Sequence, residues 1–148
     1  MSKGRPLRGI LRSIGAILAG IVIGIVLSIG TDLLMHAAGL FPPIGQPMSS
    51  RLLLLATAYR TIYSILASYV AARLAPNRPM LHAMIVGVID LIVSVIGLAV
   101  TWNKTAVFGP HWYPIALVIL ALPAAWMGGK LRSNQLPSQN ERPRSKAA

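Results

Sequence analysis

The fold is decided by two apolar runs, LLLLATAYRTIYSILASYVAARL at residues 52–74 and LHAMIVGVIDLIVSVIGLAVTW at residues 81–102. Each run is long enough to cross a bilayer, because about 20 helical residues span the hydrocarbon core. Each also carries one formal charge well inside it, Arg60 in the first run and Asp90 in the second. Since an unpaired charge in hydrocarbon is costly, these two opposite charges are expected to be paired.

The composition around these runs is that of a membrane protein. Of the 148 residues, 55% are apolar and 11% are charged, against about 25% charged in soluble domains. The net charge of +11 comes from basic residues that mostly flank apolar runs, where they indicate topology and contact with anionic lipid headgroups rather than with nucleic acid. Cysteine is absent, which excludes disulfides and thiolate sites.

We therefore predict an all-α fold, an integral membrane bundle of four transmembrane helices. The transmembrane domain covers residues 14–130, with spans at about 14–38, 52–74, 81–102 and 113–129. Residues 1–13 form a basic head, and residues 131–148 form a basic tail expected to be disordered or to lie on anionic headgroups. Only a tight antiparallel turn fits between residues 74 and 81, so the second and third spans are predicted to form a central hairpin.

The distribution of Lys and Arg predicts the orientation. Eleven of these residues lie in the head, the hairpin turn and the tail, whereas the two loops on the other side hold only Arg51 and Lys104. By the positive-inside rule both termini are expected to be cytoplasmic, with the two loops outside.

Small residues mark the faces on which helices are expected to pack. In the third span they alternate at spacings of four and three, together with Asp90, and fall within an arc of about 80°. The first span contains the close-approach motif Gly20-x-x-x-Gly24. We predict helix packing, within one chain or between protomers, at Gly20, Gly24, Gly87 and Gly97.

The partner of Arg60 is left open between two acids. From their positions along the two spans, Arg60 and Asp90 differ in depth by only about 4 Å, which an arginine side chain can bridge. Asp32, near the outer end of the first span, is the rival partner. Polar residues inside or at the edge of the bundle form a candidate intramembrane site: Arg60, Asp90, Tyr59, Tyr63, Asp32 and Ser94.

Two interpretations of this set stay open. One is a proton or ion pathway, or a site for an anionic or quinone-like ligand at Arg60. The other is a buried ion pair with hydrogen-bonded tyrosines that only fixes helix register.

Nothing in the sequence indicates an enzyme, a metal site or a cofactor. No Ser-His-Asp order, phosphate loop or paired carboxylates appear, so no catalytic residue is predicted. No two of His36, His82 and His111 have metal-ligand spacing within one helix. We expect a protein that is not an enzyme and holds no cofactor.

Several loop stretches resemble those of uncharacterised small bacterial four-helix inner-membrane proteins. The resemblance covers nearly the whole chain and rests on Thr31-Asp32 through His36-Ala37, Phe41-Pro42-Pro43-x-Gly45-Gln46-Pro47-Met48, Ala58-Tyr59-Arg60 and Phe108-Gly109-Pro110-His111-Trp112-Tyr113-Pro114. It implies a multi-pass protein of the bacterial inner membrane and supplies no activity. It also adds three polar candidates on the outer side, His36, Gln46 and His111.

The sequence leaves two alternative functions. The first is a non-enzymatic accessory or self-associating membrane protein, as a homo-oligomer or with a membrane-protein partner. The alternative is a small transporter or an ion or proton pathway that uses Arg60 and Asp90.

Overall fold

The computed structural model describes residues 4–43 and 45–136, and this part of the chain contains helices and no strands. The helices are α1 (Gly4–Ala37), α2 (Ser50–Leu74), α3 (Pro79–Thr101), α4 (Thr105–Phe108) and α5 (Trp112–Asn134). Four of them, α1, α2, α3 and α5, are long and apolar enough to cross a membrane. The predicted all-helical architecture with four candidate spans is confirmed.

The helix ends differ from the predicted ones by more than two residues in two places. Helix α1 begins at Gly4, within the predicted basic head, and α5 continues to Asn134, within the predicted tail. A helix satisfies its own backbone hydrogen bonds, so it need not stop where the apolar run stops. The prediction of a disordered tail otherwise concerns residues 137–148, which lie outside the described residues.

The turn between α2 and α3 has the tight form that its length predicts. Arg78 adopts a left-handed conformation with φ 45°, and Pro79 follows as the first residue of α3. Proline suits this position because its fixed φ matches the helix and its missing N–H would have no partner there. The chain therefore reverses direction within residues 75–78.

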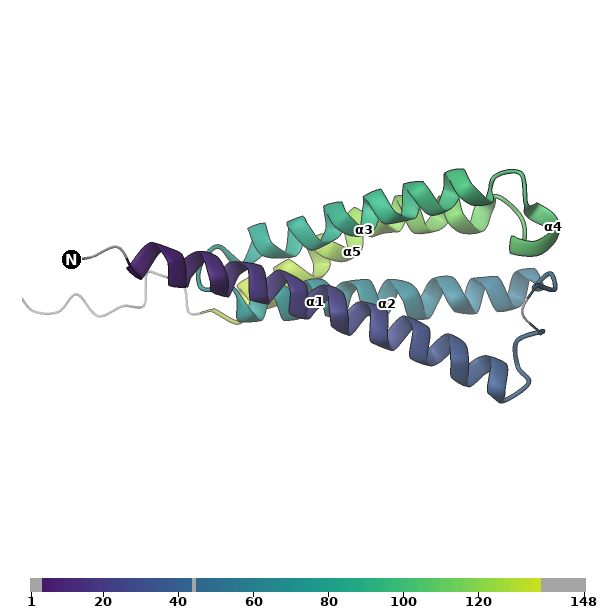
Figure 1. The fold of residues 1–148 in the computed structure, drawn as a ribbon, viewed down its shortest axis with the longest axis horizontal. Coiled ribbons are helices and arrows are strands. Elements are labelled where there is room, and N and C mark those ends of the chain that lie inside the picture. The colour runs from purple at the N-terminus through teal and green to yellow at the C-terminus, as the bar shows by residue number, and fades with distance from the viewer. Residues whose placement is uncertain (1–3, 44, 137–148) are drawn as a thin grey trace, which may run out of the picture.

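The bundle has a turn end and a loop end. Figure 1 shows the start of α1, the turn at residues 75–78 and the end of α5 at the turn end, and residues 38–49 and α4 at the loop end. Helix α2 is central, because α1 and α5 both pack extensively on it and α3 contacts it as well. Helices α2 and α3 follow one another through the tight turn as an antiparallel hairpin, although α3 packs more extensively on α5 than on α2.

Small residues bring the helices together in the turn half of the bundle. A Cβ atom at Gly20 would lie 2.5 Å from the carbonyl oxygen of Ala67 on α2, and one at Gly24 would lie 3.2 Å from the Ala67 side chain. On α3, a Cβ at Gly87 would overlap the side chain of Ala125. These three glycines therefore lie at close helix contacts within one chain.

Helix α5 contributes two packing glycines that the sequence analysis missed. A Cβ at Gly128 would overlap the carbonyl oxygen of Ile65 and lie 2.8 Å from the backbone nitrogen of Tyr69, and one at Gly129 would lie 2.7 Å from the sulfur of Met80. The signal was present as small residues at four-residue spacing on α5, namely Ala121, Ala125 and Gly129, with Ala124 and Gly128 beside them.

Gly97 does not share this role. Nothing in the described part of the chain lies within 4 Å of a Cβ placed there, so Gly97 packs on no helix of this chain, and its packing between protomers stays a prediction. The physical reason is that α3 and α5 diverge from α1 and α2 toward the loop end (Figure 1), which separates the second half of α3 from α1 and α2.

Candidate functional site

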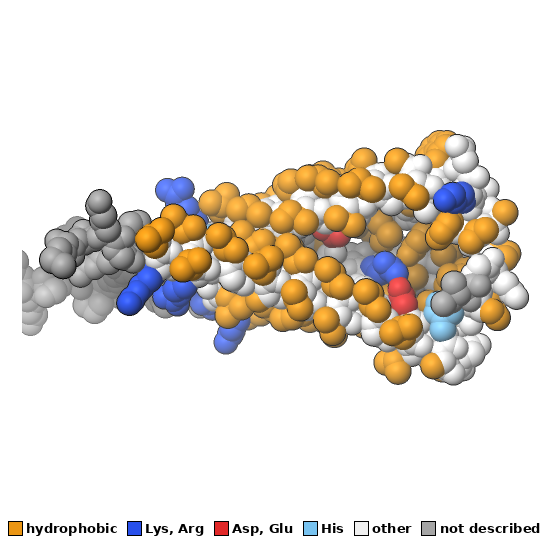
Figure 2. All heavy atoms as spheres, in the orientation of Figure 1, with side chains coloured by type: hydrophobic (Ala, Val, Ile, Leu, Met, Phe, Trp, Pro, Cys, Tyr) orange, Lys and Arg blue, Asp and Glu red, His pale blue; other side chains and the backbone are white. Residues whose placement is uncertain are grey.

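A cavity of about 540 Å³ fills the space between the diverging helices in the loop half. All four long helices and α4 contribute to its lining. Figure 2 shows the molecule hollowed here between α1 and α3, with basic and acidic side chains visible in the hollow. Its polar lining consists of Ser28, Asp32, His36, Arg60, Thr61, Ser64, Asp90, Ser94, Thr101, His111 and Tyr113.

Arg60 forms its ion pair with Asp32. The Nη2 atom of Arg60 donates to one carboxylate oxygen of Asp32, and the Tyr59 hydroxyl donates to the other. The side chains of Arg60 and Asp32 are 34% and 27% exposed, because both also line the cavity. The Nε atom of Arg60 is buried without a hydrogen-bond partner in the described part of the chain, so the pair is incompletely satisfied.

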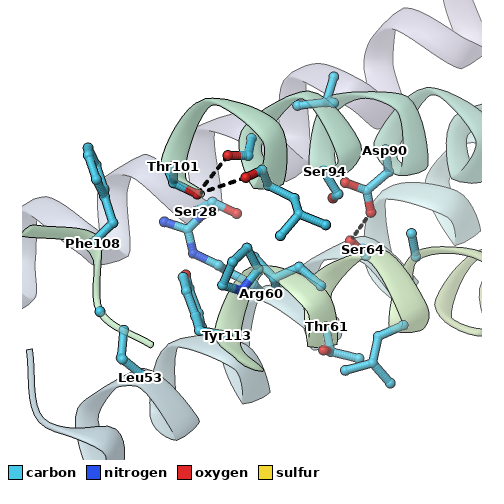
Figure 3. A pocket seen from close by; sticks show the side chains of 18 of the residues that line it. Ser28, Leu53, Arg60, Thr61, Ser64, Asp90, Ser94, Thr101, Phe108 and Tyr113 are labelled. Carbon is cyan, nitrogen blue, oxygen red and sulfur yellow. Dashed lines mark hydrogen bonds between the residues drawn. The ribbon is translucent and has the colours of Figure 1, made fainter. Parts of the chain in front are cut away.

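The expected pairing of Arg60 with Asp90 is therefore wrong, and the rival partner is the one observed. Helical side chains lean toward the N-terminus of their own helix. Arg60 thus leans toward the loop end, where α2 begins, whereas Asp32 and Asp90 lean toward the turn end, where α1 and α3 begin. In Figure 3 the guanidinium of Arg60 points away from Asp90. Although the backbones of Arg60 and Asp90 lie at similar depths, their side chains lean in opposite directions and do not meet.

Asp90 lies at the end of the cavity nearest the turn half. It is the lining residue of α3 closest to the turn, just as Ser64 is on α2. The Ser64 hydroxyl donates to the Asp90 carboxylate over 2.6 Å (Figure 3). Among the side chains described in residues 7–43 and 45–136, no Lys, Arg or His lies within salt-bridge distance of Asp90. The closed end of the cavity therefore holds a carboxylate without a basic partner from this part of the chain.

The two tyrosines among the intramembrane candidates have different partners. The Tyr59 hydroxyl donates to Asp32 of the ion pair, whereas the Tyr63 hydroxyl shares a 2.8 Å hydrogen bond with Thr31 on α1. Ser94 lines the cavity one helical turn from Asp90. The structure thus places Asp32, Arg60, Asp90 and Ser94 around one cavity, and Tyr59 supports the ion pair through its hydrogen bond to Asp32.

Two of the three outer-side candidates belong to the same space. His36 and His111 line the cavity, His36 bonded through Nδ1 to the Asp32 carbonyl oxygen at 2.8 Å and His111 through Nε2 to the Trp102 carbonyl oxygen at 2.8 Å. Gln46 is exposed in the loop before α2 and is not among the lining residues. The two histidines therefore mark the loop end of the cavity.

The sequence analysis missed the cavity and took its α3 wall for a packing seam. Along this stripe, Ala83 and Gly87 are buried in the turn half, whereas Asp90, Ser94, Gly97 and Thr101 line the cavity. One stripe of small residues therefore packs closely at one end and leaves space at the other. Tyr113, Thr61 and Ser64 were not site candidates, although Ser64 stands one turn from Arg60 on α2.

No protein family, curated protein or solved structure matches this chain. The cavity combines an ion pair, a carboxylate bonded to a hydroxyl, and a wall of hydroxyl and apolar side chains. Such a site is suited to binding a charged species within a membrane.

Proposed function

We propose that this chain is a small non-enzymatic protein of the bacterial inner membrane that forms a solute or ion pathway with Asp90 as its binding group. Both termini lie in the cytoplasm in this proposal, and the loop end faces outside, in agreement with the distribution of Lys and Arg. The proposal keeps the transporter alternative from the sequence and assigns different roles to its two charges.

The position of Asp90 carries the proposal. A carboxylate inside a membrane bundle is neutralised by a proton or paired with a cation, and no described basic side chain pairs with this one. Asp90 faces a cavity that continues to the loop end. The Arg60–Asp32 pair lines the middle of this route and, being already paired, leaves Asp90 as the group to which a cation or proton can bind.

The accessory or self-associating protein, which was the first prediction from the sequence, is kept as the second candidate function. Its main support was the small-residue stripes, which could have implied a second copy. Contacts within one chain now account for Gly20, Gly24 and Gly87, so these residues no longer require another protomer. Only Gly97 among the four is without a packing neighbour inside the described chain.

Ion flux into proteoliposomes tests the pathway. The purified protein is reconstituted with a pH-sensitive dye inside the vesicles, and a potassium diffusion potential, negative inside, drives protons inward; sodium flux is measured in parallel. We expect flux well above that of protein-free vesicles, and its loss in Asp90→Asn. Tyr69→Phe serves as the control variant, because Tyr69 lies away from the cavity and its hydroxyl bonds to Gln135.

Wild-type flux of protons and sodium equal to that of protein-free vesicles would overturn the pathway. Flux that persists unchanged in Asp90→Asn would overturn the role of Asp90. Circular dichroism of each variant shows whether the helices are retained, so that a lost flux is not mistaken for a lost fold.

A further inference from the structure

We propose that the ligand of the cavity is an organic cation with an apolar body, whose charged group lies at Asp90. This inference rests on the proposed function in one respect, the assignment of Asp90 as the binding group. It adds the chemical class of the ligand, which a pathway for protons or metal ions does not require.

The charge of the lining selects a cation. Arg60 and Asp32 offset each other through their ion pair, and Asp90 receives a hydroxyl hydrogen bond from Ser64, which does not neutralise it. Apart from the two histidines, the lining holds two carboxyl side chains and one guanidinium, so one carboxyl side chain is in excess. An anionic ligand would be repelled in a low-dielectric site, whereas a cation would replace the partner that Asp90 lacks among the described residues.

The size and the apolar part of the lining select an organic cation over a metal ion. A volume of about 540 Å³ falls in the range of pockets for drug-sized ligands, about 300–1,000 Å³. Apolar side chains form much of the wall, among them Val93, Leu98, Phe108, Leu117 and Leu120. A small ion would leave this surface in contact with water, whereas an apolar body would cover it.

The gap between α1 and α3 gives such a ligand access from the bilayer. Helix α1 packs mainly on α2, and its contact with α3 is the smallest of the major helix contacts. The hollow in Figure 2 opens on the side of the bundle, between these two helices. Because the long axis of the bundle crosses the membrane, this opening faces lipid, in which an amphipathic cation concentrates.

Binding of a matched pair of probe ions tests the inference. Tetraphenylphosphonium and tetraphenylborate have nearly the same size and opposite charge. Each is titrated by calorimetry into the full chain in phosphatidylcholine nanodiscs, with protein-free nanodiscs as the blank. We expect the wild-type protein to bind the phosphonium and to show no binding of the borate above the blank.

Three variants locate the bound phosphonium. Asp90→Asn is expected to weaken its binding about 30-fold or more, as when a desolvated ion pair loses one partner. Val93 lines the cavity and is 61% exposed, which places it at the mouth of the cavity; Val93→Trp obstructs this mouth without changing a charge, and we expect it to weaken binding strongly. Val95→Trp is the matched control, because Val95 is exposed on the same helix and is not part of the lining; it is expected to bind as the wild type does.

Several results would overturn the inference: no binding of the phosphonium, equal binding of the borate, or an unchanged affinity in Asp90→Asn or Val93→Trp. If Asp90→Asn does not fold, the comparison of Val93→Trp with Val95→Trp still decides the location, and the two probes still decide the charge. Proton or sodium flux without phosphonium binding would refute the ligand class and leave the pathway standing. Phosphonium binding without proton or sodium flux would refute the pathway and leave the ligand class standing.

Discussion

Arg60 lies in the middle of a candidate membrane span and keeps its charge through contacts with another helix. Asp32 accepts hydrogen bonds from both Arg60 and Tyr59, so this carboxylate joins α1 to two neighbouring residues of α2. The positions of α1 and α2 around the cavity therefore depend on the Asp32 carboxylate. We expect removal of this carboxylate to affect stability as well as binding.

A double-mutant cycle measures this dependence. The free energy of unfolding is determined by reversible SDS titration in mixed micelles for Arg60→Met, Asp32→Asn and the double variant. We expect each single change to cost about 2 kcal/mol, and a coupling of about 1–2 kcal/mol between the two. This coupling is smaller than for a fully buried pair, because about one third of each side chain is exposed and solvent screens the attraction.

The same cycle with Asp90→Asn in place of Asp32→Asn is the control. Arg60 and Asp90 form no salt bridge, so their effects on the free energy of unfolding should add within about 0.5 kcal/mol. A coupling with Asp90 as large as that with Asp32 would contradict the observed pairing.

At the scale of the helices, close packing depends on glycines in the turn half. Gly128→Ala brings a methyl group against backbone atoms of Ile65 and Tyr69, which cannot move without shifting α2. We expect a loss of about 2 kcal/mol in the free energy of unfolding. Gly97→Ala, with nothing within 4 Å, should change it by no more than about 0.5 kcal/mol.

The SDS titration described above checks this pair of variants too. Equal losses in both would mean that α5 does not approach α2 as closely as the glycine contacts require. Disulfide crosslinking between copies that carry Gly97→Cys, in native membranes, would instead support self-association through the face of α3 on which no described helix packs at Gly97.

The sequence predicted the helices far better than their contacts. Hydropathy and length suffice for four spans, because the bilayer imposes both on any crossing helix. The partner of Arg60 was left open between Asp90 and Asp32 because depth alone was compared, although the direction of a helical side chain follows from the direction of its helix. The α5 glycines were visible in the sequence at the required spacing, and were overlooked because they adjoin the basic tail.

The cavity could not be predicted, because it depends on where packing stops. Small residues of α3 line it from Asp90 onward and pack closely before that point. No periodicity in the sequence distinguishes the two halves of the stripe. Only the divergence of α3 and α5 from α1 and α2 toward the loop end (Figure 1) separates them.

At the scale of the whole molecule, the bundle is closed by small residues in the turn half and hollow in the loop half. With the loop end facing outside, as proposed, this shape admits water and solutes to Asp90 from outside and blocks them from the cytoplasm. The chain contains no cysteine, so each position can be tested with a single introduced thiol and no background reaction.

Labelling of such thiols in intact spheroplasts, with a membrane-impermeant maleimide, tests orientation and shape together. Asn103→Cys, in the exposed loop before α4, should react from outside, whereas Asn77→Cys, in the turn, should react only after permeabilisation. Ser94→Cys should also react from outside, because Ser94 lines the polar cavity, whereas its neighbour Val95→Cys should not, because a thiol in lipid does not form the reactive thiolate. If Asn77→Cys reacts in intact spheroplasts and Asn103→Cys does not, the proposed orientation is wrong and the turn end faces outside. If Ser94→Cys and Val95→Cys are equally protected, water does not reach the cavity.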